Sequence, residues 1–299
     1  MAQLKPFRGD YYLWEYVPSK AAAILFTILF IIATGAVIWR MVRTKTLFSI
    51  AFTIGGLFEI IGYAARAVAE DKTEQLSPFI VQSVLLLVAP ALFAASIYMV
   101  LGRLMVSIHG ERHSLIPVRW LTKAFVAGDV FSFMVQASGA GLMAKSDFSQ
   151  DTAQNIILAG LFIQIVMFGL FAVTAIVFDV RMRRWPSGAS MAEDGRIVWM
   201  LYAASALIMV RSIFRVIEYA TGKDGYLLGH EWTLYVFDAV LMLAVMVVYA
   251  WIYPGGLSAA AATKPRPWEP VDSAASAGAG EEMRYGSGDG LRAAEAGRK

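Results

Sequence analysis

Ionisable side chains occur inside stretches that are otherwise apolar, and their spacing follows one face of an α-helix. Residues that recur at i, i+4, i+7 and i+11 fall on the same side of a helix. In the second apolar stretch this pattern selects Gly55, Glu59, Gly62 and Arg66. A charged group inside a membrane costs about 2.5–3.5 kcal/mol on insertion scales, so such residues indicate a binding or conduction site.

The same spacing recurs in three later apolar stretches. It selects one set from Asp129 to Gly139, a second from Arg211 to Gly222, and a third that comprises Glu231, Tyr235 and Asp238. Two further stretches contain a glutamine each. The candidate ligand-binding or translocation residues are therefore Glu59, Arg66, Gln82, Asp129, Gln136, Gln164, Arg211, Arg215, Glu218, Glu231 and Asp238.

Acidic residues outnumber basic ones in this set, five to three. At least two acids therefore lack a basic partner inside the membrane. They are protonated, reach the interface or meet a cationic ligand. A purely structural interpretation stays open, in which pairs such as Arg215 with Glu218, or Arg211 with Glu59, hold the helices together.

The elements that must position these residues are membrane-spanning helices. The 299 residues are 58% hydrophobic and only 16% charged, against roughly 25% charged residues in a soluble domain. About 20 apolar residues cross the hydrocarbon core as a helix. We predict an all-α bundle of seven transmembrane helices, at residues 20–40, 47–69, 78–102, 121–144, 154–179, 197–219 and 232–253.

Lys and Arg are distributed unevenly between the two sides of this bundle. The loops that follow the first, third and fifth spans carry eleven of them, whereas the opposite loops carry Lys72, Lys145 and Lys223. Cytoplasmic loops carry the excess of positive charge. The bias predicts an N-terminus outside and a C-terminus in the cytoplasm.

Three regions follow from this topology. Residues 1–19 form an extracellular segment whose Tyr11, Tyr12, Trp14 and Tyr16 are typical of an interfacial aromatic belt. Residues 20–254 form the transmembrane domain. Residues 255–299 are rich in Ala, Gly, Ser, Pro and charge, which predicts a disordered cytoplasmic tail.

The sequence offers little for enzymatic chemistry. It has no cysteine, no phosphate-binding loop motif, no H-E-x-x-H and no G-x-S-x-G. His109 and His113 share a loop but lack a third metal ligand. We expect a protein that is not an enzyme, with no catalytic residue, cofactor or metal. A net charge of +3 gives no support to a nucleic-acid partner.

Several of these segments resemble a known family, the fungal lipid-translocating exporters, which include aminocholesterol-resistance proteins and sphingoid-base exporters. The resemblance covers about 250 residues and is carried by Glu59 to Arg66, Gln82-Ser83, Ala89-Pro90, Ala94 to Tyr98, Gly102-Arg103, Asp129, Gln136, Gly139 to Gly141, Arg211 to Tyr219, Gly222, Gly225, Glu231, Tyr235 and Asp238. It implies a seven-span protein linked to sphingoid-base export, to resistance against amphiphilic toxins and, in one branch, to porphyrin handling.

Two functions remain open from the sequence. The first is a translocator of lipids or amphiphiles, sphingoid-base-like or sterol-like, that contributes to resistance against toxic lipids. The second is a seven-helix receptor or stress sensor for an amphiphilic ligand, since the helix count and orientation fit it equally well. In both cases we expect membrane lipids and an amphiphilic small molecule as partners, and the plasma membrane as the location.

Overall fold

The computed structural model describes Trp14 and residues 16–71, 73–107, 117–143, 150–183, 191–221 and 226–257. Over these residues the chain is helical and contains no strand. The expected seven spans are confirmed, because seven helical segments within the described residues are long and apolar enough to cross a membrane. They are α1 (Lys20–Thr44), a 3-10 turn (Leu47–Ser49) with α2 (Ile50–Ala69), α3 (Leu76–Ser107), α4 (Val118–Met143), α5 (Gln150–Arg183), α6 (Met191–Ala220) and the composite segment Glu231–Trp251.

The seventh span differs from the regular helix that its hydropathy predicts. It starts as α8 (Glu231–Leu234), widens into a π-helical turn at Tyr235–Val240 and continues as α9 (Leu241–Trp251). A short helix, α7 (Tyr226–Gly229), precedes it. Single π-helical turns inside α-helices are rare and are often found at functional sites.

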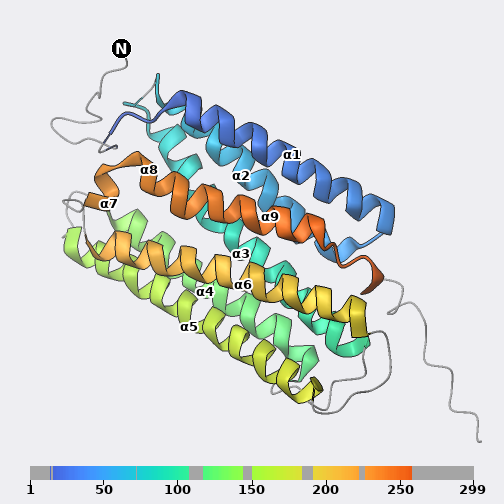
Figure 1. Ribbon diagram of the computed structural model, residues 1–299. Coiled ribbons are helices and arrows are strands. Elements are labelled where there is room, and N and C mark those ends of the chain that lie inside the picture. Colours follow the sequence, from blue (N-terminus) through green and yellow to red (C-terminus); the bar gives the residue numbers. More distant parts are fainter. Residues whose placement is uncertain are drawn as a thin grey trace, which may run out of the picture. The chain divides into compact units, whose positions relative to one another are not determined.

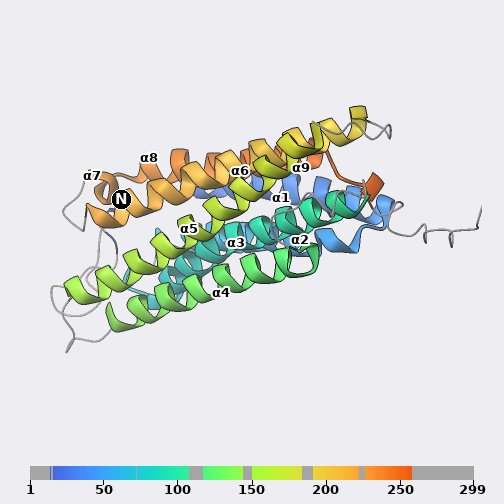
Figure 2. The ribbon, with the colours of Figure 1, turned by 90° about the horizontal axis from the view of Figure 1, so that it is seen from below.

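In Figure 1 the helices form two groups on either side of α3, and Figure 2 shows α5 running diagonally between α4 and α6. On one side α1, α2 and α9 lie together, and on the other side α4, α5 and α6 lie together (Figure 1). The pairs α2–α3 and α4–α5 form the most extensive contacts, and α9 contacts both α1 and α6. The helix α9 closes the bundle against α1 and α6. Side chains of α2, α3, α6 and the seventh span can therefore meet inside the bundle.

Glycine allows the closest of these contacts. A Cβ atom at Gly160 of α5 would lie 2.9 Å from the Ser132 carbonyl oxygen of α4, and one at Gly139 would lie 2.9 Å from the Ala153 carbonyl oxygen of α5. The backbones of α4 and α5 therefore touch, as small residues permit in membrane bundles. Aromatic rings fill the adjoining core, for example Tyr98 against Phe171, with ring centroids 4.4 Å apart.

The outward-facing side chains are apolar. Ile32 is 63% exposed, Phe162 63% and Met134 64%. Exposed apolar residues of this size occur on most of the spanning helices, and a continuous apolar surface suits contact with lipid rather than water. The protein is therefore an integral, multi-pass membrane protein.

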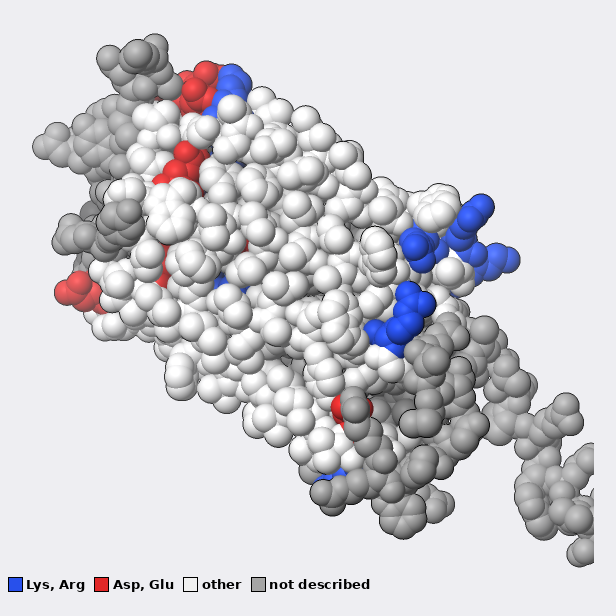
Figure 3. Space-filling view, in the orientation of Figure 1, with Lys and Arg blue, Asp and Glu red and all other residues white. Residues whose placement is uncertain are grey.

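The two ends of the bundle differ in charge. Figure 3 shows Lys and Arg gathered near the end where α1 finishes, and Asp and Glu toward the end where α1 begins. Arg40 and Arg43 of α1 and Arg196 of α6 are exposed at the basic end. This distribution agrees with the Lys/Arg bias, and the orientation of the termini stays a prediction.

One detail of the predicted aromatic belt is wrong. Trp14 is only 6% exposed, because its ring packs edge-on against Phe79 and lies 5.6 Å from the Arg66 guanidinium. It packs inside the protein rather than at the lipid interface. Tyr11, Tyr12, the pair His109 and His113, and the tail from residue 258 onward lie outside the described residues.

Candidate functional site

The centre of the candidate site is Asp238, on the π-helical turn of the seventh span. It is 2% exposed and is held by two arginines of α6. Arg211 Nε donates to Oδ1, and Arg215 donates to Oδ2 at 2.8 Å. Arg211 also donates to the Leu86 carbonyl oxygen of α3 at 2.8 Å. One carboxylate thus ties α6 to the seventh span, and Arg211 ties both to α3.

Arg215 has a second acidic partner. Its Nη1 lies 2.9 Å from Glu218 Oε2, three residues further along α6. The sequence left this pair open as one of two examples of a structural ion pair, and the structure contains it. The two arginines and the two acids Asp238 and Glu218 therefore balance in charge within a buried group.

Glu59 of α2 lies beside this balanced group without joining it. It is 1% exposed and close enough to Asp238, Arg211 and Arg215 for their charges to act on it. Its Oε1 has no hydrogen-bond partner among the described residues. The alternative pair of Arg211 with Glu59 is wrong, because Arg211 is already occupied by Asp238 and Leu86.

Other buried polar atoms near Glu59 also lack partners within the described part of the chain. They are the hydroxyl of Tyr63, one turn further along α2, and Nε of Arg215. Buried polar groups are nearly always hydrogen-bonded, so several unpaired ones in one place indicate a site for water, a proton or a ligand. We call Glu59, Tyr63, Arg211, Arg215 and Asp238 the central cluster.

A second network lies nearer the end of the bundle where α1 begins. Arg66 of α2 pairs with Glu231 at 2.7 Å and donates to the hydroxyls of Tyr16 at 2.9 Å and Tyr235 at 3.1 Å. Glu231 also accepts the backbone N–H of Ser19, at 2.8 Å. Arg66 is fully buried, so this network joins the N-terminal segment to α2 and the seventh span.

Asp129 belongs to a third, separate group. Tyr98 of α3 donates to its Oδ2 at 3.0 Å, while Oδ1 has no partner among the described residues. Among the five candidate acids, Asp129 and Glu59 are thus the two that form no ion pair with a described Lys or Arg, as the excess of acids predicts. One and two turns further along α4, Ser132 and Gln136 extend the group.

The glutamines divide between these groups. Gln136 donates to Gln164 at 3.1 Å and so joins α4 to α5. Gln82 of α3 is buried, and its Oε1 has no partner within the described residues. Because Gly62 packs on Leu86 in the antiparallel α2–α3 pair, Gln82 lies one turn beyond Leu86, toward the level of Arg66.

The structure therefore brings five of the eleven candidate residues together and places the other six in separate groups. Glu59, Arg211, Arg215, Glu218 and Asp238 meet. Arg66 and Glu231 form their own network, and Asp129, Gln136 and Gln164 lie between α3, α4 and α5. Sequence reasoning missed the tyrosines at positions 16, 63 and 98, although Tyr63 continues the α2 stripe at i+4 from Glu59.

The comparison with known proteins identifies the family. Residues 52–260 match the family described as "RTA1 like protein", which covers most of the bundle and both networks around α2 and the seventh span. The chain belongs to this family. The resemblance predicted from the sequence is confirmed, and no solved structure matches the chain.

Three relatives from Saccharomyces cerevisiae illustrate the range of the RTA1-like family. The chain is 39% identical over 282 residues to Protoporphyrin uptake protein 1, covering 81% of this chain and 92% of the relative. It is 34% identical to Protein RTA1, with 83% and 86% covered. It is 28% identical to the sphingoid long-chain base transporter RSB1, with 70% and 64% covered. Two of these names describe transport of amphiphilic molecules.

Proposed function

We infer that the protein translocates amphiphiles across the membrane and that Glu59 receives a cationic amine headgroup, as on a sphingoid base. The observation that carries this proposal is the unpaired Glu59 carboxyl beside a charge-balanced group. Arg211 and Arg215 supply two positive charges, and Asp238 and Glu218 supply two negative ones. Glu59 is the remaining acid, so it holds either a proton or a cation from outside the protein.

An ammonium group suits this position for a simple electrostatic reason. Removing an isolated ammonium from water is very costly, and a buried carboxylate lowers that cost by pairing with it. The same carboxyl holds a proton when no amine is present, since an unpaired charge at 1% exposure would be unstable. Binding of the amine thus exchanges a proton for a cation at Glu59.

The central cluster is closed in this structure, so translocation requires movement of the helices around it. Two irregular places lie beside the cluster. Pro90 lies inside α3, one turn after Leu86, and the π-helical turn Tyr235–Val240 contains Asp238. Both loosen the regular hydrogen bonding of a helix. They support a path that opens between α2, α3, α6 and the seventh span.

The family supports transport more than any enzymatic role. One relative is named a sphingoid long-chain base transporter and another a protoporphyrin uptake protein. We extend to this chain the transport of an amphiphile, with the amine class favoured by Glu59. A contribution to resistance against toxic lipids, and a location in the plasma membrane, are part of this proposal.

The test is transbilayer movement of a sphingoid base, labelled on its chain, in liposomes that contain the purified protein. The wild type should accelerate movement over protein-free liposomes. Glu59→Gln should remove most of that acceleration, because glutamine keeps the shape of a protonated glutamate but has no negative charge to form an ion pair with an ammonium. An N-acetylated sphingoid base, which carries no charge, should move equally in both proteins.

Asp71→Asn is the matched control, since Asp71 is an acid with a 62% exposed side chain that pairs with Lys20 at the bundle end. It should move the amine lipid like the wild type. Full transport of the amine by Glu59→Gln would refute the role of Glu59. If the protein accelerated the transbilayer movement of protoporphyrin but not of the sphingoid base, amphiphilic amines would be refuted as the substrate class, and a transport function would remain.

A further inference from the structure

A hollow at the basic end of the bundle lies far from the central cluster and has a different chemistry. Arg40 of α1, Arg196 and Ile197 of α6, and the segment Trp251–Tyr253 after α9 line it. Its volume is about 120 Å³. That is room for about four water molecules, comparable to the five heavy atoms of a phosphate group.

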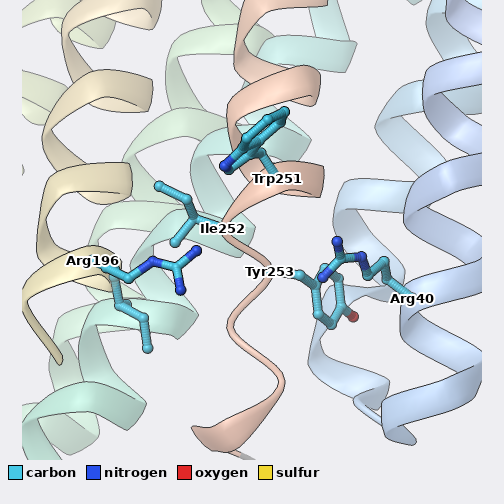
Figure 4. Close-up of a pocket in the computed structure, with 6 residues that line it drawn as sticks. Arg40, Arg196, Trp251, Ile252 and Tyr253 are labelled. Carbon is cyan, nitrogen blue, oxygen red and sulfur yellow. The ribbon is translucent and has the colours of Figure 1, made fainter. Parts of the chain in front are cut away.

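Two arginines reach into this hollow from opposite sides. Figure 4 shows Arg196 and Arg40 extending toward the turn that contains Tyr253, each from its own helix. Neither guanidinium has an ion pair or a hydrogen bond to any residue that the structure describes. Two unpaired positive charges that converge on one space are a receptor for an anion, and guanidinium groups bind phosphate oxygens in a bidentate manner.

The floor of the hollow is held in place before any ligand arrives. The Tyr253 hydroxyl bonds to Thr46 and, at 2.9 Å, to Ser49, which also bonds Tyr249 at 2.9 Å. A Cβ atom at Gly255 would lie 2.8 Å from Thr44, so the chain after α9 packs tightly on the end of α1. The position of the end of α1, the helix that bears Arg40, is therefore fixed relative to Tyr253.

The rim of the hollow indicates a lipid as the source of the anion. Trp251 is 74% exposed, and tryptophan concentrates at the level of lipid headgroups. The Lys/Arg bias predicts that this end faces the cytoplasm, where anionic lipids are enriched, and basic pockets between helices on that side bind phosphate headgroups. We propose that Arg40 and Arg196 bind the phosphate of an anionic membrane lipid, such as a phosphatidic acid, beside Trp251.

The experiment measures thermal unfolding of the full chain in detergent while dioleoyl phosphatidic acid is added. The lipid should raise the unfolding temperature saturably, by several degrees, as binding to the folded state does. Dioleoyl phosphatidylcholine, whose phosphate is covered by choline, should not. The double variant Arg40→Gln/Arg196→Gln should bind phosphatidic acid at least tenfold more weakly.

A charge-matched control separates this site from general basicity. Arg43→Gln/Lys123→Gln removes two exposed cations at the same end, outside the hollow, and should bind like the wild type. If the first double variant does not fold, Arg40→Lys/Arg196→Lys keeps the charge, loses the bidentate geometry and should bind more weakly. The proposal would be overturned if Arg43→Gln/Lys123→Gln lost as much affinity for phosphatidic acid as Arg40→Gln/Arg196→Gln. Unchanged affinity in both variants of Arg40 and Arg196 would overturn it too.

Soluble phosphates test the source of the anion. Glycerol 3-phosphate and inorganic phosphate should give no saturable shift of the unfolding temperature at concentrations where the lipid is saturating. Neither has acyl chains that can pack on the apolar surface beside Trp251. A shift of equal size with glycerol 3-phosphate would contradict a lipid site, since the pocket would then recognise the phosphate alone.

Discussion

Asp238 illustrates how a buried acid differs from a surface acid in this protein. It accepts from both Arg211 and Arg215 at 2% exposure. When a buried carboxylate is neutralised, its partners stay behind as uncompensated charges, and breaking a buried pair typically costs about 3–5 kcal/mol. Asp238 therefore stabilises the fold mainly because its loss would leave Arg211 and Arg215 buried without a counter-charge.

The prediction at the residue scale concerns Asp238→Asn. We expect a fall in the free energy of unfolding of about 3–5 kcal/mol, seen as a markedly lower unfolding temperature in detergent. Asp71→Asn breaks the exposed pair with Lys20 and should leave that temperature nearly unchanged, since water screens surface pairs. Equal shifts of the unfolding temperature in Asp238→Asn and Asp71→Asn would mean that the ion pairs of Asp238 do not behave as buried ones.

The pairing of charges could be predicted from the sequence only in part. The pair Arg215–Glu218 is local, three residues apart on one helix, and was one of the two pairs that the sequence left open. The choice of Asp238 rather than Glu59 as the partner of Arg211 depends on how α2, α6 and the seventh span pack, and helix periodicity carries no information on that. The buried position of Trp14 depends on long-range packing in the same way.

At the scale of the elements, α4 and α5 depend on two glycines for their contact. Gly160→Ala would place a Cβ atom 2.6 Å from Gln136 Cγ and 3.0 Å from the Gln136 backbone nitrogen. The helices would have to separate, at a cost of about 1–3 kcal/mol. We expect a lower unfolding temperature and weakening of the contact between Gln136 and Gln164.

Gly141→Ala is the control on the same helix as Gln136. A Cβ atom there would have no atom within 4 Å, and alanine favours a helix over glycine by about 1 kcal/mol. We expect an unchanged or slightly higher unfolding temperature. A stabilised Gly160→Ala protein would show that α4 and α5 do not touch at this point.

The spans themselves could be predicted because hydropathy and length decide them. The expected and observed ends agree within a few residues for the first and second helices, whereas α3, α5 and α6 extend beyond the predicted stretches, α5 and α6 into polar sequence. The π-helical turn and α7 could not be predicted. A wider turn has the same composition as the helix around it, and a four-residue helix such as Tyr226–Gly229 depends on its neighbours.

At the scale of the whole molecule, orientation follows from the unequal charge of the two ends. The chain contains no cysteine, so a single introduced cysteine reports one position without further substitution. Asp71→Cys lies between α2 and α3, and Arg43→Cys lies near the end of α1. The Lys/Arg bias predicts that the first faces outward and the second faces the cytoplasm.

An impermeant maleimide checks this prediction in intact cells. Asp71→Cys should be labelled directly, and Arg43→Cys only after permeabilisation. The wild-type chain gives the background signal. The opposite labelling pattern would reverse the topology and would place the two-arginine hollow at the outer leaflet.

The network around Arg66 also has a consequence for how the chain is made. Arg66 and Glu231 are 165 residues apart. A ribosome adding about 5–20 residues per second completes that interval in roughly 8–33 s. During that time the guanidinium has no carboxylate partner from the seventh span. Tyr16, already synthesised, can hold it by the same hydrogen bond at 2.9 Å that the finished protein keeps. The N-terminal segment thus offers this buried cation a hydrogen-bond partner before the carboxylate of the seventh span exists.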